Sequence, residues 1–281
     1  MDIQWSLVLF TALTGMGGWL FFFICLNVFV RKTDKGAFAG TATALALTVV
    51  GGLASVTHLS HPDRMLGALQ HPTSGIFTEA LLVGLLAIVM IAFLVMLRRG
   101  IDGGALKAVA VVGMALGALM SFMAGQSYLM SAIAAWNTEL LPLGYLGTAA
   151  ASGAAAYLVL IAAQKADENA CSLYGLMTLA AGCVALITVL AYGAVAGAFA
   201  GDAAPMTIAA AAFGGVAPIA CGFLARKKPG SAVALGAVAL ICLLYTSNPH
   251  CPNLPNQLCM VHIVKKSFNI EFNDIVQVCL L

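Results

Sequence analysis

The sequence predicts an all-α polytopic membrane protein, a bundle of about eight transmembrane helices with its N-terminus outside. The chain has 281 residues, of which 62% are hydrophobic and only 9% are charged, whereas soluble domains carry about 25% charged residues. Its apolar residues gather in runs long enough to span a bilayer, for which about 20 residues are needed. Its basic residues occur in alternate connections between these runs, as the positive-inside rule requires. Composition, run length and charge pattern therefore agree on the fold class.

The first apolar run covers residues 5–30 and is followed by Arg31-Lys32. Because no basic segment precedes it and it is long enough to span, we interpret it as a retained first helix rather than a cleaved signal peptide. The connections between the runs are brief, so neighbouring helices are expected to run antiparallel. The remaining expected spans, of which the last is short, are residues 38–57, 76–97, 107–130, 143–164, 171–199, 205–225 and 231–246.

The distribution of lysine and arginine predicts the orientation of the bundle. Before the C-terminal tail, the connections on the opposite side hold only Arg64. The N-terminus and residues 57–79 are therefore expected outside. A net charge of only +2 gives no indication of a nucleic-acid partner. Ten of the thirteen basic residues fall on the other, inner side: Arg31, Lys32, Lys35, Arg98, Arg99, Lys107, Lys165, Arg226, Lys227 and Lys228.

The C-terminal segment differs in composition from the rest of the chain. We expect residues 1–245 to form one transmembrane domain and residues 246–281 to form an atypical tail. From Leu240 onward the sequence has no Gly and no Ala in 42 residues, although both are frequent before. We therefore hypothesise that the sequence from about residue 243 onward is not native continuation, through a frameshift or a joined foreign sequence. The alternative is a genuine polar tail with a weak helix near residues 261–281.

The stretch THLSHPDRMLGALQHPTSGIFTE, residues 57–79, concentrates the titratable chemistry of the chain. It holds three of the five histidines together with Asp63, Arg64 and Glu79. Ionisable residues close to the hydrocarbon of a bilayer are costly and point to function. His58 ends the second expected span and Glu79 lies near the start of the third. The two side chains are therefore expected to face each other at the outer rim of the membrane.

A pair of this kind suits the oxidation of a quinol, which must release two protons as well as two electrons. A histidine titrates near neutral pH, and a partly desolvated carboxylate can be tuned toward it. We predict that His58 and Glu79 are catalytic and that Arg64 is a supporting charge. His61 and His71, each followed by a proline, are expected to be loop residues. Taken singly, a histidine at a helix end also fits an interfacial residue, and Glu79 also fits a helix-terminus charge.

The sequence gives no sign of a haem, an iron–sulfur cluster or a metal site in this chain. The two histidines outside residues 57–79, His250 and His262, lie in the tail, so no span before it offers an interior haem ligand. The eight cysteines are scattered and form no C-x-x-C motif, which argues against a cluster. Any electrons taken from a quinol would therefore have to pass directly to a partner protein.

Two motifs resemble the membrane anchor subunit family of dimethyl sulfoxide reductase. The sequence HLSHPDR at 58–64 is similar to a histidine–leucine loop of that family, although Ser60 replaces the usual glycine. Ser74 and Glu79 match the serine and glutamate at the start of the family's third helix. Residues 128–153 resemble its tyrosine, tryptophan–asparagine and proline pattern between helices four and five. The resemblance covers about residues 1–245.

This resemblance implies a subunit of the bacterial cytoplasmic (inner) membrane that works in anaerobic respiration. The family's anchors oxidise menaquinol without a haem and pass electrons to an iron–sulfur subunit. That subunit supplies a molybdopterin catalytic subunit, which reduces an S- or N-oxide. The family's functional histidine and glutamate correspond to His58 and Glu79.

Further residues are expected around the same outer pocket, and other functions of the chain remain as alternatives. Ser74, Gln126, Tyr128 and Trp136 are candidates for binding or supporting the quinol, although Tyr128 and Trp136 also fit an interfacial aromatic belt. The alternatives are an anchor of a polysulfide- or tetrathionate-type reductase, a purely structural anchor, or a small-molecule transporter. Transporters have polar or broken helices at the membrane midplane. In this chain the polar groups concentrate at the outer rim instead, which argues against a transporter.

Overall fold

The computed structural model describes residues 5–30, 33, 36–56, 75–129, 131, 137–199 and 204–246. These residues form helices and no strand, which confirms the predicted all-α membrane fold. The helices are α1 Trp5–Val30, α2 Ala37–Val56, α3 Gly75–Arg98, α4 Gly104–Gln126, α5 Leu140–Ala163, α6 Glu168–Val195, α7 Ala204–Ala211, a π-helical turn Ala212–Val216, α8 Ala217–Lys227, a 3-10 turn Pro229–Ser231 and α9 Ala232–Thr246.

Within the described part of the chain, seven spans are long and apolar enough to cross a membrane. The seventh runs through α7, the π-helical turn and α8. The eighth expected span corresponds to α9, which has 15 residues and is short, as the sequence indicates. The apolar runs of the sequence thus match the helices closely, because a bilayer admits only segments whose backbone hydrogen bonds are satisfied internally.

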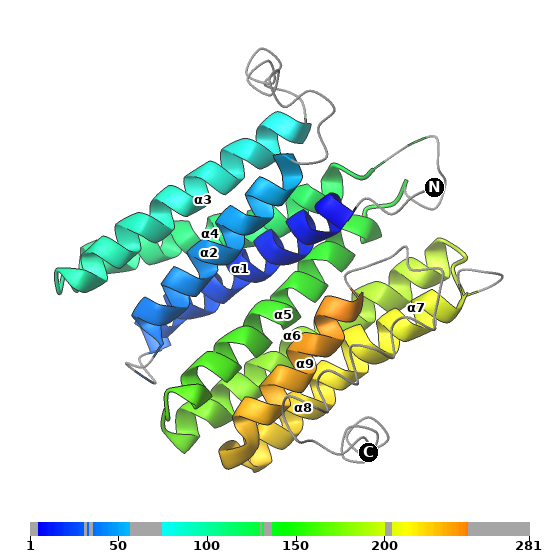
Figure 1. The fold of residues 1–281 in the computed structure, drawn as a ribbon. Coiled ribbons are helices and arrows are strands. Elements are labelled where there is room, and N and C mark those ends of the chain that lie inside the picture. The colour runs from blue at the N-terminus through cyan, green and yellow to red at the C-terminus, as the bar shows by residue number, and fades with distance from the viewer. Residues whose placement is uncertain are drawn as a thin grey trace.

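Helix α1 lies at the centre of the bundle and packs against α2, α4 and α5. Figure 1 shows α1–α4 as one group of roughly side-by-side helices and α5–α9 as a second group, which meet where α1 and α4 contact α5. Small residues allow these close approaches. A Cβ added at Gly153 of α5, for example, would overlap the α1 backbone at Trp19.

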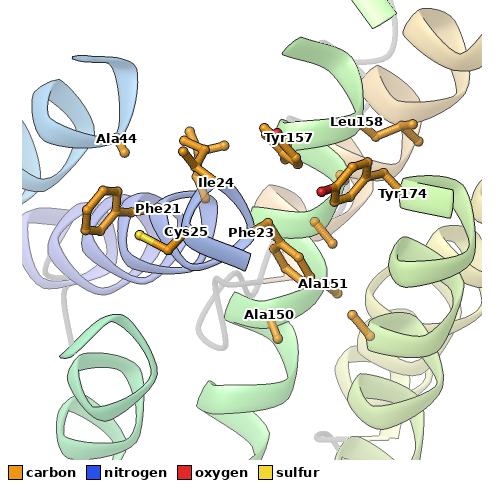
Figure 2. Close-up of a cluster of buried hydrophobic side chains, with 14 of the residues drawn as sticks. Phe21, Phe23, Ile24, Cys25, Ala44, Ala150, Ala151, Tyr157, Leu158 and Tyr174 are labelled. Carbon is orange, nitrogen blue, oxygen red and sulfur yellow. The ribbon is translucent and has the colours of Figure 1, made fainter. Parts of the chain in front are cut away.

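The core between the two groups is formed by large side chains of α1, α5 and α6 together with alanines. Figure 2 shows Ile24 of α1 and, across from it, the rings of Tyr157 and Tyr174, which make an edge-to-face contact with centroids 4.6 Å apart. The Tyr174 hydroxyl donates to Asn27 Oδ1 over 2.8 Å.

The outer surfaces of the helices are apolar. Ile88 of α3 and Ile187 of α6, for example, are 63% and 65% exposed. A soluble protein rarely exposes large apolar surfaces of this kind. They are expected where a helix faces lipid rather than water.

Three helices begin about three residues before the apolar runs that predicted them. The runs expected from 107, 143 and 171 start as helices at Gly104, Leu140 and Glu168. The added residues are Gly-Ala-Leu, Leu-Leu-Pro and Glu-Asn-Ala, and the ends of a helix are the part of it that is least sharply defined.

The two ends of the bundle differ in charge. The connections α3–α4, α5–α6 and α8–α9 lie at one end, here called the basic end (Figure 1). The opposite end, here called the Glu79 end, carries the start of α3 and the end of α4, with Glu79 and Glu139. The described cations of the basic end are Arg98, Arg99, Lys107, Lys165, Arg226, Lys227 and Lys228.

Candidate functional site

The predicted site residues divide into those that the structure describes and those that it does not. Glu79, Gln126 and Tyr128 are described, and all three belong to the Glu79 end of the bundle. Their roles therefore depend on the contacts made there by α3, α4 and α5. All five histidines of the chain lie outside the described residues. Four of the predicted site residues lie outside them as well, namely His58, Arg64, Ser74 and Trp136.

Glu79 is the fifth residue of α3 and its side chain is half-buried. This agrees with the expectation that it lies near the start of the third span. Its carboxyl group lies near the side chain of Ser127, at the end of α4. Gly75 lies where the two helices approach, since a Cβ added there would lie 3.1 Å from Ser127 Oγ. The start of α3 is thereby held against the end of α4.

Ser127 follows the last residue of α4 and is exposed at the Glu79 end. Its hydroxyl donates to Met123 O over 3.1 Å, and its backbone N–H donates to the same carbonyl over 3.0 Å. The end of α4 also lies directly against the start of α5, because a Cβ added at Gly125 would overlap Pro142 Cα. These two contacts of α4 place Ser127 and the residue after it between α3 and α5.

Tyr128 lies just beyond α4, and its phenol is half-buried. Its ring stacks on that of Tyr145 of α5, with the centroids 5.5 Å apart and the planes at 11°. Burial, and next the negative charge of Glu79, raise the pKa of Tyr128 to about 12. Tyr128 is therefore a neutral hydrogen-bond donor near pH 7. Tyr145 in turn lies within electrostatic range of Glu79 and of Tyr192 on α6.

Gln126 and Ser121 make contacts of a different kind. The Gln126 side-chain amide donates to Glu139 Oε2 over 2.9 Å and so joins the end of α4 to the residue before α5. Ser121 is buried, accepts the indole N–H of Trp19 at 2.9 Å and donates to Ala118 O. Ser121 therefore serves the packing of α1 on α4. A role for Gln126 in quinol binding stays a prediction.

Glu79, Ser127, Tyr128 and Tyr145 lie near one another, and we call these four residues the Glu79 cluster. It combines a carboxylate that can accept a proton, a hydroxyl that can donate or accept a hydrogen bond, and two phenols. The four residues come from α3, the end of α4 and α5, so that the cluster lies at the rim of the bundle. Such a set can bind and deprotonate a hydroxylated aromatic ring that reaches the end of a membrane span.

Ser127 and Tyr145 were not among the residues predicted from the sequence. Ser127 stands between Gln126 and Tyr128, both of which were predicted, but a serine at the end of a membrane helix carries no signal by itself. Tyr145 falls inside the motif at 128–153, yet no spacing rule connects it to Glu79. Its place beside Tyr128 follows from the packing of α5 on α4, which only the folded chain shows.

Comparison with known proteins identifies the family. No curated protein matches the sequence closely enough to be counted as a relative. The family model for the DMSO reductase anchor subunit (DmsC) matches residues 1–267, which is nearly the whole chain and ends within the tail segment 246–281. The family and the seven long apolar helices agree on a multi-pass membrane protein that serves as an anchor subunit. This chain belongs to the DMSO reductase anchor subunit (DmsC) family.

Proposed function

We propose that this subunit oxidises menaquinol at the Glu79 end and passes the electrons to an iron–sulfur partner subunit. In this proposal, a molybdopterin catalytic subunit then uses the electrons to reduce an S- or N-oxide in anaerobic respiration. The complex would lie in the bacterial cytoplasmic membrane. The family supports the role of anchor, and the Glu79 cluster supports the chemistry.

The observation that carries the proposal is the setting of the Glu79 carboxyl group. It is half-buried at the end of a span, near Ser127, and close enough to Tyr128 for its charge to raise the pKa of that phenol. A quinol arrives from within the bilayer, so its ring must meet its proton acceptor near the rim. Tyr128 and Tyr145 supply aromatic surface at that point. His58 would be the second proton acceptor.

The reaction balances with these groups. Oxidation of one quinol to one quinone releases two electrons and two protons. Glu79 would accept one proton from a quinol hydroxyl and His58 the other, before each passes its proton to solvent. Both electrons would leave the ring for the iron–sulfur subunit. Tyr128, neutral near pH 7, would donate a hydrogen bond to a quinol oxygen and orient the ring.

The charge pattern supports an orientation for this site. The basic end would face the cytoplasm, as the positive-inside rule requires, and the Glu79 end would face outside. The iron–sulfur subunit would then dock against the Glu79 end, where the electrons are released.

The test uses membranes that contain the complete complex and a soluble menaquinol analogue as electron donor. Glu79→Gln and His58→Ala should each lower quinol-dependent reduction of the acceptor by about 10²-fold or more, because a proton acceptor is lost. An artificial dye that reduces the catalytic subunit directly should still support full activity. That second rate shows that the complex remains assembled.

Glu168→Gln is the matched control. Glu168 is likewise a glutamate near the start of a long helix, but it is exposed and lies at the basic end. Its replacement should leave both rates unchanged. Undiminished quinol oxidation in both Glu79→Gln and His58→Ala would show that the proposed site is wrong.

A further inference from the structure

Tyr128 follows the last residue of α4, and its backbone is held by hydrogen bonds of that helix end. Its N–H donates to Gly125 O over 3.2 Å, and the next N–H, that of Leu129, donates to Gln126 O over 3.1 Å. Both bonds join residues three apart, so the end of α4 tightens into a 3-10 turn. The turn fixes the position of the Tyr128 backbone, whereas the direction of its side chain is chosen among rotamers by what packs against it.

The ring of Tyr145, on α5, packs against the ring of Tyr128. The two centroids are 5.5 Å apart and the planes are at 11°. At this distance, nearly parallel rings form an offset stack, an arrangement that aromatic pairs favour. A change of rotamer at Tyr128 would break the stack, so the stack selects the direction in which the Tyr128 phenol points.

Tyr145 is itself held in place by contacts of α5 on either side of it in the sequence. A Cβ added at Gly125 of α4 would overlap Pro142 Cα, and a Cβ added at Gly147 would lie 3.1 Å from Ala185 Cα of α6. Both contacts involve backbone atoms, which cannot turn aside. Tyr145 therefore provides a fixed surface against which the Tyr128 ring is set.

The Tyr128 phenol is thereby fixed where α3, α4 and α5 meet. The residue before it, Ser127, lies against the start of α3, since a Cβ added at Gly75 would lie 4.0 Å from Ser127 Cα. Residues four apart share one face of a helix, so Glu79 lies on the same face of α3 as Gly75. The stack with Tyr145 thus sets the direction of a phenol that lies beside this face of α3.

We propose that Tyr145 is a positioning residue, whose ring holds the Tyr128 phenol in the direction in which it donates a hydrogen bond to a quinol oxygen. This inference rests on the proposed function, which gives that hydrogen bond to Tyr128. The flat ring of Tyr145 carries the role, and its own hydroxyl is not needed. A quinol held through one oxygen by Tyr128 is oriented relative to Glu79 before any proton is transferred.

The test compares Tyr145→Leu with Tyr145→Phe in membranes that contain the complete complex. Tyr145→Leu removes the flat ring and should raise the KM for the menaquinol analogue about three- to tenfold, the effect of one weakened hydrogen bond. The turnover number should stay within about twofold, because the lost interaction is one of binding. Tyr145→Phe keeps the ring and should retain the wild-type KM.

A merely structural role of Tyr145 predicts a different result. Fewer complexes would then assemble, so the rates with the quinol analogue and with the artificial dye would fall together while the KM stayed unchanged. That result in Tyr145→Leu would overturn the inference. A KM in Tyr145→Phe as high as in Tyr145→Leu would also overturn it, because the hydroxyl rather than the ring would then be required.

A double variant shows whether Tyr145 acts through Tyr128. Tyr128→Phe removes the hydroxyl that is to be oriented but keeps a ring for the stack, and alone it should raise the KM by about three- to tenfold. In that background, Tyr145→Leu should change the KM by no more than about twofold, since no hydroxyl is left to orient. A second full increase would show that Tyr145 acts independently of Tyr128.

Phe223→Leu is the matched control. Phe223 is an aromatic residue of α8 that is 43% exposed and lies one turn before Lys227, at the basic end. Replacing its ring in the same way should leave both KM and turnover unchanged.

Tyr145→Met supplies a second variant without a ring, and its flexible side chain fills the space more readily than leucine does. It should raise the KM as Tyr145→Leu does. If neither variant gives a complex that the dye can drive, Tyr145 is required for assembly and the positioning role is wrong.

The outcomes distinguish this inference from the proposed function. If Glu79→Gln and His58→Ala lose quinol oxidation while Tyr145→Leu keeps the wild-type KM, the positioning role is wrong and the site stands. If both Glu79→Gln and His58→Ala retain full quinol oxidation, the proposed function fails and the inference fails with it.

Discussion

Tyr128 lies beside a carboxylate in a half-buried setting, and this fixes its protonation state. An ordinary tyrosine titrates at a pKa of about 10, and burial together with Glu79 raises the pKa of Tyr128 to about 12. A phenol whose charged form is disfavoured in the folded state stabilises that state below the unfolded pKa. The stabilisation is lost as the pH rises through the folded value. The sensitive range is therefore about pH 10 to 12.

Tyr128→Phe should accordingly make thermal stability less dependent on pH in that range, because the substituted ring has no proton to lose. The measurement is the melting temperature of the detergent-solubilised protein at steps between about pH 8 and 12, for wild type and variant. Below about pH 10, the difference between the two should be constant. Equal losses of stability in both proteins across the sensitive range would contradict the raised pKa of Tyr128.

At the scale of helices, the contact of α4 with α5 depends on Gly125. A Cβ added there would overlap Pro142 Cα, which belongs to backbone that cannot turn aside. Gly125→Ala should therefore destabilise the protein by about 1–3 kcal/mol, the usual cost of overpacking. It should also displace Tyr128, which follows shortly after, and so lower quinol oxidation. Melting temperature and turnover measure the two effects.

Gly84→Ala is the control for this substitution. Gly84 lies on the exposed surface of α3, and a Cβ there meets nothing within 4 Å. Alanine is the better helix former, so this change should be neutral or stabilising by up to about 1 kcal/mol. A loss of stability in Gly84→Ala as large as in Gly125→Ala would show that the effect is not one of helix spacing.

The bond from Trp19 Nε1 to Ser121 Oγ, 2.9 Å long, joins α1 to α4. A double-mutant cycle with Trp19→Phe and Ser121→Ala should give a coupling energy of about 0.6 kcal/mol, and at most about 1.7 kcal/mol, as interhelical bonds in membranes do. Unfolding of the four proteins in the same detergent measures it. Strictly additive losses would mean that the bond contributes nothing to stability.

At the scale of the whole molecule, charge is distributed unevenly between the two ends. Seven described cations and three described acidic residues, Asp102, Asp167 and Glu168, lie at the basic end, in contrast to Glu79 and Glu139 at the other. Because lysine and arginine remain in the cytoplasm, an epitope inserted at Asn137 should bind antibody on intact spheroplasts. The same epitope at Gly100 should require permeabilised membranes. The reverse result would invert the proposed orientation and move the partner subunit to the other face.

The sequence was sufficient to predict the spans but not the full site. Hydropathic runs of about 20 residues identify membrane helices because a helix satisfies all backbone hydrogen bonds of such a segment within itself. Hydropathy does not indicate which faces of the helices pack against each other. The start of α3 near Glu79 was therefore predictable, whereas the approach of Ser127 to the start of α3 was not. It is seen at Gly75, whose added Cβ would lie 3.1 Å from Ser127 Oγ once α3 and α4 are packed together.

Two further predictions from the sequence stay predictions. The pairing of His58 with Glu79 depends on a residue outside the described part of the chain. The hypothesis that the sequence from about residue 243 onward is not native continuation concerns a segment of which the structure describes only the residues up to Thr246. Sequencing the source transcript tests the second prediction, since an uninterrupted native reading frame would contradict it.

The π-helical turn at Ala212–Val216 has a consequence for how this chain tolerates changes in length. Removing one residue from an ordinary membrane helix rotates everything beyond it by about 100°, because each residue advances the helix by that angle. A π-helical turn already holds one residue more than the α-helix around it. Deleting Ala212 should therefore remove the π-helical turn while Pro218 and Cys221 keep their facing. The span would lose a residue without losing its register.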